Sequence, residues 1–409
     1  MFTKTKLIGS CMHKKIFCQN LLDSALKNSI HAKRKQCLVR FLSDLMDYDT
    51  TLSVTEIGKK LTSKTTVKSK IYAAQTFVNN FKLERDIVCI YKSLAHFFWS
   101  HAKEIVVLID WTGGCSEGYH VLEASIAAHG RSIPIYHEVH SESEQENAEI
   151  HRQFLLRLKE VIPSSLSVTI ITDAGFHREW FQQVLELGWD VIGRIYSLYC
   201  YQIEGETNWH KVKDILFEGI GKASALGKVK LGKTKKAVEG YIYTYKEKLS
   251  GKVRKKKNKY PSHDKAHSNY YKNGWVLFSS LNKHARFLVS YYKKRMQIEQ
   301  NFKDIKNEQL GMGLRRNQSS GKTRVNMLFF LAVLLIMIAW WFGLIIESLN
   351  KHRSYQANTI KNKRVRSFIH LARMAYRHEP ELLNWDLFQN IMSDLKQQYH
   401  SFIECGALS

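Results

Sequence analysis

The sequence predicts a mixed α/β fold with helical regions at both ends of the chain. Three observations support this prediction: the first hundred residues have helical periodicity, strand-like runs begin near residue 104, and a long apolar helix follows near residue 325. A chain of 409 residues is long enough for two or three domains. We predict a helical domain over 1–100, an α/β domain over 101–349 and a helical region over 350–409.

The chain is strongly basic, with 62 Lys and Arg against 37 Asp and Glu and a formal net charge of +25. An excess this large indicates a polyanionic partner, and its spread along the chain favours nucleic acid over a membrane surface. The basic clusters lie at 33–35, 59–70, 228–236, 252–257 and 361–366. The seven cysteines are scattered without a C-x-x-C pair, which argues against a zinc ribbon or a disulfide framework and indicates a reducing, cytoplasmic compartment.

The first hundred residues contain two short predicted helices with lysines around them. Ser53 and Glu56 have the spacing of a capping box, which predicts a helix in TEIGKKL, and a second helix follows over about 65–79. The pair resembles a helix-turn-helix, whose second helix enters the major groove of DNA. The candidate DNA contacts are Lys64, Lys68 and Lys70. An ordinary helix pair that carries lysines is the alternative.

From residue 104 the pattern becomes that of buried strands. EIVVLID is a continuous apolar run that ends at Asp110, and SVTIITD is another that ends at Asp173. HVLEASIAAH and SIPIYHEVH are typical of two further strands, and helices are expected over 147–160 and 176–187, before a strand in WDVIGRI. The order of three strands, helix, strand, helix, strand predicts a ribonuclease H-like core, with one aspartate at each of two strand ends.

Between residues 197 and 285 the α/β alternation stops. This segment is rich in Lys, Gly and Tyr and contains strand-like pieces such as VEGYIYTYK and GWVLFSSL. We predict a β-rich insertion over 197–285 with a mobile basic loop at 250–269. A long helix is expected to start near residue 287, and a polar helical tail follows the apolar helix.

The segment Met327–Ile346 contains no charged residue and is long enough to span a bilayer. The alternative is a central helix that is buried on all sides in a large α/β domain. No second segment of this kind occurs, and basic residues flank it on both sides, so no orientation signal is present. We therefore predict a buried helix over about 325–349 and no membrane partner.

The helix after the insertion carries one carboxylate among an aromatic residue and two cations. The four residues, at offsets of 0, 3, 7 and 14, are Tyr292, Arg295, Glu299 and Lys306. At about 100° per residue these positions fall within a sector of roughly 60°, so all four project from one stripe of the helix. This arrangement suits a metal ligand beside bound phosphates, and a solvated helix face with ion pairs is the alternative.

Asp110, Asp173 and Glu299 can converge on one pocket, because the aspartates end strands and the glutamate lies on a following helix. Mg²⁺ prefers carboxylate oxygens and keeps open water positions, so three carboxylates match a site for phosphoryl transfer. Two such ions, about 3.5–4 Å apart, would activate the attacking oxygen and stabilise the leaving oxygen. We expect two Mg²⁺ ions, for which Mn²⁺ could substitute.

LIDWT, TDAGF and the pattern Y-x2-R-x3-E-x6-K resemble the transposases of the insertion-sequence-four family, and the chain is most similar to the insertion-sequence-ten group. The resemblance covers nearly the whole chain. Similar segments are ASIAAHGRSIPIY, ELGWDVIGRI, KRMQIEQNFKDIK and YQANTIKNKRV. The signature occurs together with the two aspartates, the strand order and the β-rich segment before the glutamate. A chance match of the signature alone would not explain these other features.

The resemblance implies that Asp110, Asp173 and Glu299 bind the metal ions and act in catalysis. It also implies a group of residues that contact phosphates at the transposon end. These residues are Tyr292, Arg295 and Lys306.

Trp275 stands where related transposases place a tryptophan that stacks on a flipped base. Such a stack would contribute about 1–3 kcal/mol, and a core aromatic in a strand is the alternative. Some relatives carry a second aromatic residue where this chain has Met296, so base extrusion is expected to use different contacts here. His177 is expected either to contact DNA or the site, or to have a local structural role.

The resemblance implies cut-and-paste transposition: nicking of the transposon end, hairpin formation, hairpin opening and strand transfer into target DNA. The implied partners are double-stranded DNA, as terminal inverted repeats and target, and a second copy of the chain, with helices of about 365–405 as contacts. A bacterial cytoplasmic enzyme associated with the nucleoid is expected. The alternatives are an inactive copy that only binds DNA, a membrane protein with a basic cytosolic domain, and a ribonuclease H-like nuclease that does not transpose.

Overall fold

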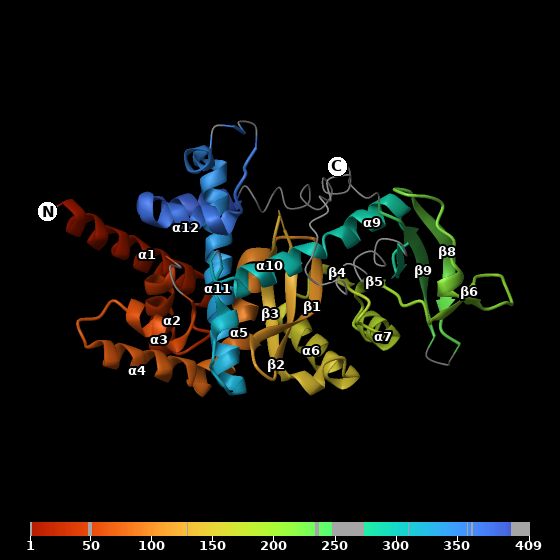
Figure 1. Cartoon of the computed structure of the whole chain (residues 1–409), viewed down its shortest axis with the longest axis horizontal. Helices are drawn as coiled ribbons and strands as arrows, with labels where there is room; N and C mark the ends of the chain where they lie inside the picture. Colours follow the sequence, from red (N-terminus) through yellow and green to blue (C-terminus); the bar gives the residue numbers. More distant parts are fainter. Residues whose placement is uncertain are drawn as a thin grey trace, which may run out of the picture.

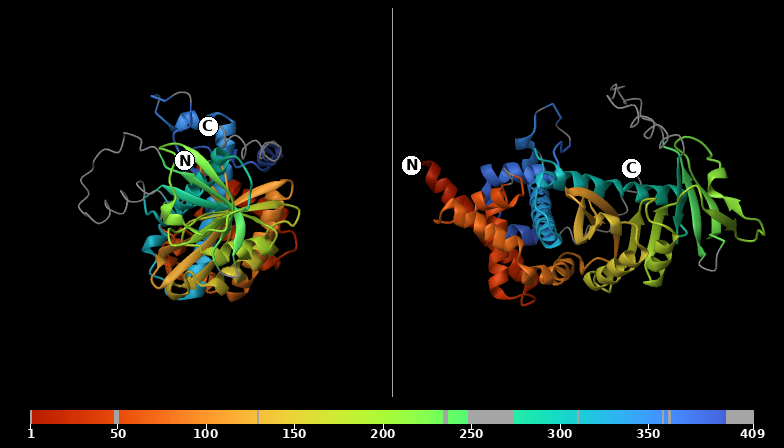
Figure 2. Two further views of the ribbon diagram at one scale, coloured as in Figure 1. Left: turned by 90° about the vertical axis from the view of Figure 1, so that its right-hand side faces the viewer. Right: turned by 60° about the horizontal axis from the view of Figure 1, so that its bottom comes forward.

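The molecule is elongated, with a helical region at one end and a sheet that runs through its centre to the other end (Figure 1). The right-hand view in Figure 2 shows the same succession of parts, and the left-hand view looks along the long axis of the molecule. The computed structural model describes residues 2–47, 51–128, 130–233, 237–247, 274–309, 311–357, 359–360 and 363–393, with side chains from residue 12 onward.

Ten strands of the described residues form one sheet in the order β3-β2-β1-β4-β5-β10-β9-β8-β6-β7. β4 is parallel to β1 and to β5, and the other neighbouring pairs are antiparallel. The strands are β1 (Glu104–Ser116), β2 (Tyr119–Ala127), β3 (Ser132–Ser141), β4 (Ser167–Thr172), β5 (Asp190–Arg194), β6 (Cys200–Ile203), β7 (His210–Lys211), β8 (Ala223–Leu231), β9 (Val238–Tyr245) and β10 (Trp275–Ser279). The mixed α/β prediction is confirmed, and the order of β1 to β5 and their helices is consistent with a ribonuclease H-like domain.

Apolar side chains cover both faces of the central strands. Successive side chains of a strand point to opposite faces, so the run in β1 places Ile105, Val107 and Ile109 on one face and Val106 and Leu108 on the other. The two sets belong to two different apolar clusters. The first face is covered by α6 (Ala148–Val161) and α7 (Arg178–Glu186), and the second by α9 (Ala285–Lys293) and α10 (Met296–Lys306) (Figure 1).

The segment 197–285, predicted to be a β-rich insertion, contains β6 to β10. These strands continue the central sheet, because β10 pairs with β5 on one side and with β9 on the other. The basic loop predicted at 250–269 lies outside the described residues, as do the basic cluster 252–257 and parts of the clusters 228–236 and 361–366.

One long helix was expected from near residue 287, and this prediction is wrong in one respect. Two helices, α9 and α10, are separated at Lys294 and Arg295. The backbone N–H groups of Lys294, Arg295, Gln297 and Ile298 each donate to the carbonyl three residues earlier, which tightens the chain between the helices. No glycine or proline marks this position, and the break falls at an arginine whose side chain contacts two carboxylates.

The N-terminal hundred residues are helical in the described part, as predicted. The helices are α1 (Phe2–Leu26), α2 (Ala32–Leu45), α3 (Val54–Lys60), α4 (Val67–Val78) and α5 (Phe81–Trp99). Ser53 caps α3 by accepting from the backbone N–H of Glu56 at 3.3 Å. The Glu56 carboxylate binds Lys59 at 2.7 Å, so only one of the two hydrogen bonds of the predicted capping box is present. α3 and α4 pack closely at Gly58, where a Cβ would lie 2.5 Å from Ile71 Cα.

Helix α11 (Lys322–Ser348) includes the apolar segment and is buried on all sides, as predicted. Among the described residues it alone is long and apolar enough to cross a membrane, and its most apolar window is 100 % buried inside the protein. α12 (Phe368–His378) packs along it, with the rings of Phe342 and Tyr376 stacked at 4.9 Å. The predicted dimer contacts at 365–405 are described only to residue 393.

A buried polar chain joins the helical end of the molecule to the sheet. Asn326 in α11 donates through Nδ2 to Glu84 in α5 at 2.9 Å, so its Oδ1 accepts from Nε2 of His137 in β3, also at 2.9 Å. The other ring nitrogen of His137 then accepts from the Tyr91 hydroxyl at 2.6 Å. Burial lowers the pKa of His137 to about 4, so the ring is neutral near pH 7.

We predict that Gly343→Ala destabilises the protein by about 1–3 kcal/mol, because the added Cβ would lie 2.5 Å from Phe368 Cα and force α11 and α12 apart. Urea denaturation followed by circular dichroism measures this change. Ser348→Ala, at the exposed end of the same helix, is the control and should leave the free energy of unfolding unchanged. Equal stability of the two variants would contradict the close packing of α11 and α12.

We predict that His137 makes the protein less stable in acid. The unfolded chain takes up a proton at this residue near its ordinary pKa of 6.5, whereas the folded protein does not until about pH 4. The free energy of unfolding should therefore fall between these pH values by about 2–3 kcal/mol more in the parent than in His137→Gln. Urea midpoints across this range measure the difference, and identical pH dependences would refute it.

Candidate active site

Strand periodicity places Asp110 and Asp173 on one face of the sheet. Asp110 follows Val106 and Leu108 at intervals of two, and Asp173 follows Ile171. These apolar residues belong to the cluster beneath α9 and α10. Because β1 and β4 are parallel neighbours, their carboxyl ends meet at the same edge of the sheet. Both aspartates therefore lie at the sheet edge that α10 covers.

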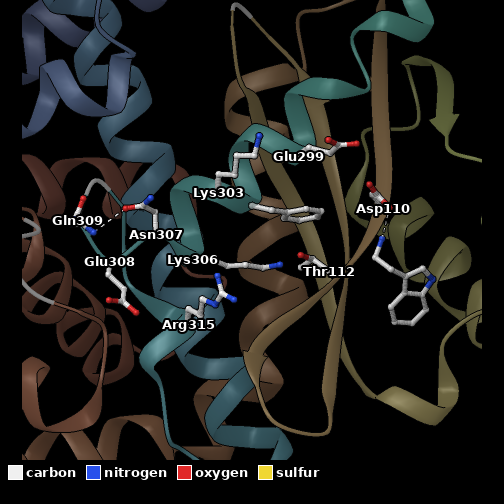
Figure 3. A pocket seen from close by; sticks show the side chains of 11 residues that line it. Asp110, Thr112, Glu299, Lys303, Lys306, Asn307, Glu308, Gln309 and Arg315 are labelled. Carbon is white, nitrogen blue, oxygen red and sulfur yellow. Dashed lines mark hydrogen bonds between the residues drawn. The ribbon is translucent and has the colours of Figure 1, made fainter. Parts of the chain in front are cut away.

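Glu299 reaches the same edge from α10. Arg295 lies between two of the carboxylates: its Nη2 is 2.6 Å from Glu299 Oε1, and its Nη1 is 3.4 Å from Asp110 Oδ2. The arginine is only 8 % exposed, so both contacts are shielded from solvent. Figure 3 shows the carboxylates of Asp110 and Glu299 next to each other.

The site has an excess of buried negative charge. Burial and the negative charge of Asp173 raise the pKa of Asp110 to about 7, and Arg295 offsets only part of this rise. Burial opposes the charge of Arg295, but Tyr292 and the neighbouring carboxylates outweigh it and raise the pKa of the arginine. Carboxylates that repel one another in this way are typical of functional sites and attract a further cation.

Each aspartate is oriented by a backbone N–H group. The N–H of Trp111 donates to Asp110 Oδ1 at 2.9 Å, and the N–H of Gly175 donates to Asp173 Oδ1 at 2.8 Å. A Cβ on Gly175 would lie 3.1 Å from Asp173 Oδ1, so a glycine at this position lets the backbone approach the carboxylate.

The opposite face of the sheet links the two strand ends through His151 of α6. Trp111 donates from Nε1 to His151 Nε2 at 3.1 Å, and the ring of Phe176 stacks on His151 with centroids 5.0 Å apart. Burial lowers the pKa of His151 to about 4, which keeps the ring nitrogen free to accept. Sequence reasoning missed His151: LIDWT and TDAGF mark the two aromatic neighbours of the aspartates, but nothing in the sequence locates their shared partner.

A buried hydrogen-bond network on the site face ties α10 to β2. Glu123 is the strand partner of Asp110 and is fully buried. Its Oε1 accepts from Ser125 at 2.5 Å and from Asn301 Nδ2 at 3.0 Å. Burial raises the pKa of Glu123 to about 8, so its carboxyl group is mostly protonated at neutral pH. This network was also missed, because an acidic residue in a strand and an asparagine in a helix carry no signal of a mutual contact.

A pocket of roughly 650 Å³ opens beside the carboxylates. Its lining includes Asp110 and Glu299 as well as Lys306, the last residue of the predicted stripe (Figure 3). The full lining is Asp110, Trp111, Thr112, Glu299, Phe302, Lys303, Lys306, Asn307, Glu308, Gln309 and Arg315. Arg295, Glu299 and Lys306 thus lie at one site, whereas Tyr292, the fourth residue of the predicted stripe, is on α9 before the helix break.

Tyr292 and Trp275 lie deeper. Tyr292 is 3 % exposed and Trp275 is 6 % exposed, and their rings meet edge to face with centroids 5.2 Å apart. The ring of Tyr245 also lies against Trp275, with centroids 5.4 Å apart. In this state Trp275 is therefore a core aromatic at the end of β10, and contacts of the two side chains with DNA stay predictions.

The N-terminal lysines lie apart from this pocket, on the helical end of the molecule (Figure 1). Lys64 and Lys68 are exposed between α3 and α4 and at the start of α4, and Lys70 is half-buried. His177 precedes α7, where Nδ1 is 3.4 Å from the Tyr199 hydroxyl and Nε2 is 3.7 Å from Glu146. These contacts are compatible with a local structural role for His177.

The donor set at the sheet edge matches divalent cations, since Asp110, Asp173 and Glu299 offer carboxylate oxygens. Burial, together with the negative charge of Asp173, raises the pKa of Asp110. In the described part of the chain, no three acidic, histidine or cysteine side chains stand close enough to hold one ion as they are placed. Arg295 lies between Asp110 and Glu299, so ion binding requires the carboxylates to close and this guanidinium to move.

A family model described as the transposase DDE domain matches residues 101–338, a span that runs from just before β1 into α11 and contains all three carboxylates. No curated protein matches the chain. Members of this family act on DNA and generally use divalent metal ions, which agrees with the basic charge and with the donor set. From the match over more than half of its length, the chain belongs to the DDE transposase family.

Proposed function

We propose that this protein is a transposase of the insertion-sequence-four family, in its insertion-sequence-ten group, and that it moves its element by cut and paste in the bacterial cytoplasm. The observation that carries the proposal is the meeting of Asp110 and Glu299 on either side of Arg295, with Asp173 close enough to raise the pKa of Asp110. These are the carboxylates that the Y-x2-R-x3-E-x6-K signature and the two strand ends single out.

Asp110, Asp173 and Glu299 would hold two Mg²⁺ ions, for which Mn²⁺ could substitute. When bound, such ions supply activation of the attacking oxygen and stabilisation of the leaving oxygen in an in-line displacement. The backbone N–H groups of Trp111 and Gly175 keep one oxygen of each aspartate fixed. The second oxygen of Asp110 contacts Arg295 and would become a ligand once the guanidinium moves away.

The proposed reaction consists of four phosphoryl transfers at this one site. Water attacks a phosphodiester at the transposon end and releases a 3′-hydroxyl. That hydroxyl attacks the opposite strand and closes a hairpin, which a second water opens. The 3′-hydroxyls finally attack target DNA. Each step forms one P–O bond and breaks another, so the chain must mainly position the strands and stabilise charge.

The cations beside the carboxylates would bind the DNA. Arg295 is held by Asp110 and Glu299, and its release toward a phosphate would leave these carboxylates free for cations. Lys306 projects into the same pocket (Figure 3). Tyr292 would join them after a local rearrangement, since it is buried in this state.

The proposal also includes recognition of the transposon end and assembly of two copies of the chain, which involve residues outside the pocket. Lys64, Lys68 and Lys70 would contact the terminal repeat around the helix pair α3 and α4, whose lysines are solvent-accessible to different degrees. Two copies of the chain would cut the two ends together, with residues near 365–405 as the contact.

We predict that Asp110→Ala, Asp173→Ala or Glu299→Ala lowers cleavage of the transposon end by at least about a hundredfold, because each removes part of a charge-stabilising site worth several kcal/mol. The DNA that flanks this gene, incubated with the protein and Mg²⁺, reports nicks, hairpins and strand transfer on a denaturing gel. End binding in a mobility-shift assay should remain.

The control for this experiment is Glu160→Ala, an exposed carboxylate on α6 across the sheet, which should cleave like the parent. Normal cleavage by any one of the three variants would refute the assignment of that residue. Nicks without strand-transfer products in the parent would instead indicate a nuclease that does not transpose.

We predict that Trp275→Ala lowers the ratio of hairpin to nicked product by about tenfold, because a base stack contributes about 1–3 kcal/mol to the hairpin step alone. Tyr245→Leu is the matched control, since Tyr245 packs on Trp275 in the same apolar cluster but has no proposed contact with a base. Thermal melts verify that both variants fold. An equal product ratio in the two variants would show that Trp275 acts only in packing.

A further inference from the structure

The pocket continues past the carboxylates into a region lined by three cations. Lys303 and Lys306 project from α10, and Arg315 projects from the short helix η3 (Leu314–Arg316) toward Lys306 (Figure 3). Lys303 and Arg315 are exposed at its surface, and Lys306 is partly buried. Lys303 lies within the family-like segment KRMQIEQNFKDIK but is not part of the Y-x2-R-x3-E-x6-K signature, and Arg315 belongs to none of the motifs singled out from the sequence.

The nearby carboxylates do not neutralise these cations. Asp304, next to Lys303 in the chain, pairs with Arg131 at 2.6 Å. Glu308 lines the pocket but pairs with Arg316, also at 2.6 Å. Among the described residues, no salt bridge is formed by the three pocket cations Lys303, Lys306 and Arg315.

The cations also repel one another. Burial lowers the pKa of Lys306 and the positive charge of Arg315 adds to this effect, whereas Cys115, Asp110 and Glu123 offset part of it. Like charges in a concave, partly desolvated place are unfavourable unless an anion binds between them. The cationic end of the pocket therefore favours binding of an anion beside the carboxylates.

Arg315 is held by a well-anchored segment of the chain. The backbone N–H groups of Met312 and Gly313 donate to the carbonyls of Asp304 and Asn307, each at 2.9 Å. Leu314 is buried at 1 % exposure, which fixes the residue directly before Arg315.

The N-terminal region supports the same segment. The N–H of Leu52 donates to the carbonyl of Met312 at 2.8 Å. Gly313 has a φ of +65°, and a Cβ there would lie 2.5 Å from Thr51 Cγ2, so this position requires glycine. A guanidinium on such a fixed backbone is preorganised for binding, unlike one on a free loop.

We propose that Lys303 and Arg315 form a phosphate-binding extension of the active site that holds the backbone of the DNA strand running into the carboxylates. The proposal rests on the proposed function, because it takes DNA as the ligand. Arg315 would grip a phosphate through its planar donor fork, and Lys303 would act as a point charge near the next phosphate. Such contacts set the register of the strand but do not read its sequence.

The neighbouring arginines provide a matched test. Arg315→Ala removes a pocket cation, whereas Arg316→Ala removes an adjacent arginine that is paired with Glu308 and is 68 % exposed in its side chain. The probe is a duplex made from the DNA that flanks the gene, with Ca²⁺ in place of Mg²⁺ to hinder cleavage. Dissociation constants are measured by fluorescence anisotropy from 50 to 300 mM salt, and thermal melts verify folding.

For Arg315→Ala we expect about tenfold weaker binding near 100 mM salt and a slope of log K against log salt that is about one unit less steep. Arg316→Ala should stay within about twofold of the parent, and Arg315→Lys should restore the slope with only part of the affinity. An unchanged slope in a folded Arg315→Ala, or an equal loss in Arg316→Ala, would overturn the proposal.

Binding is measured separately from cleavage, so the two proposals can fail separately. A parent that binds the duplex but never cleaves it contradicts the proposed function, while the salt slopes still decide the role of Arg315. A parent that cleaves normally, with the slope unchanged by Arg315→Ala, refutes the phosphate-binding extension alone.

Discussion

Helix α11 has no polar face over most of its length, and the described structure is arranged around the need to cover it. Twenty-one consecutive or nearly consecutive side chains, from Val325 to Ile346, are buried, and each large apolar one contributes about 1.5–3 kcal/mol when removed from water. The N-terminal helices α2, α4 and α5, the edge strand β3 and the C-terminal α12 all pack on it. The helical end and the sheet therefore share one core. The helical end and the sheet are also joined by polar contacts, because the neutral ring of His137 forms hydrogen bonds with Tyr91 and Asn326.

The second apolar cluster, beneath α9 and α10, brings distant parts of the chain to the active site. β1, β4 and α10 each supply one carboxylate, although these residues are far apart in the sequence. Their approach is unfavourable in itself, as the raised pKa of Asp110 shows. Arg295 offsets part of this repulsion from one side, and the backbone N–H groups of Trp111 and Gly175 offset part of it from the sheet. The remaining negative charge is what a divalent cation would neutralise.

Support for the site comes from both faces of the sheet. On the site face, Glu123 and Asn301 fix α10 against β2. On the opposite face, His151 joins Trp111 to Phe176, the aromatic neighbours of the two aspartates. These contacts hold the elements and the residues next to the carboxylates in place. Residues that never touch DNA or metal thus determine how precisely the carboxylates are placed.

The sequence by itself determined the element order, the buried helix α11 and the candidates Asp110, Asp173 and Glu299, because strand and helix periodicities are local properties of the chain. One detail went beyond it: the break between α9 and α10 falls where Arg295 contacts carboxylates, and it has no local signal. For Trp275 the sequence left two interpretations open, and the structure places its side chain in the core at the start of β10.

Only the tertiary structure decided which side chains meet. The alternation of side chains along β1 places Asp110 on one face of the sheet. Only the packing of the whole chain decides that α10 covers this face. The partnerships of Glu123 with Asn301, of His151 with Trp111, and of Glu308 with Arg316 link positions that no sequence spacing relates. The last one leaves Arg315 as a cation without a carboxylate beside it among the described residues. The sequence shows how many basic residues the chain has. Only the three-dimensional structure shows which of them are paired with carboxylates and which remain available to a ligand.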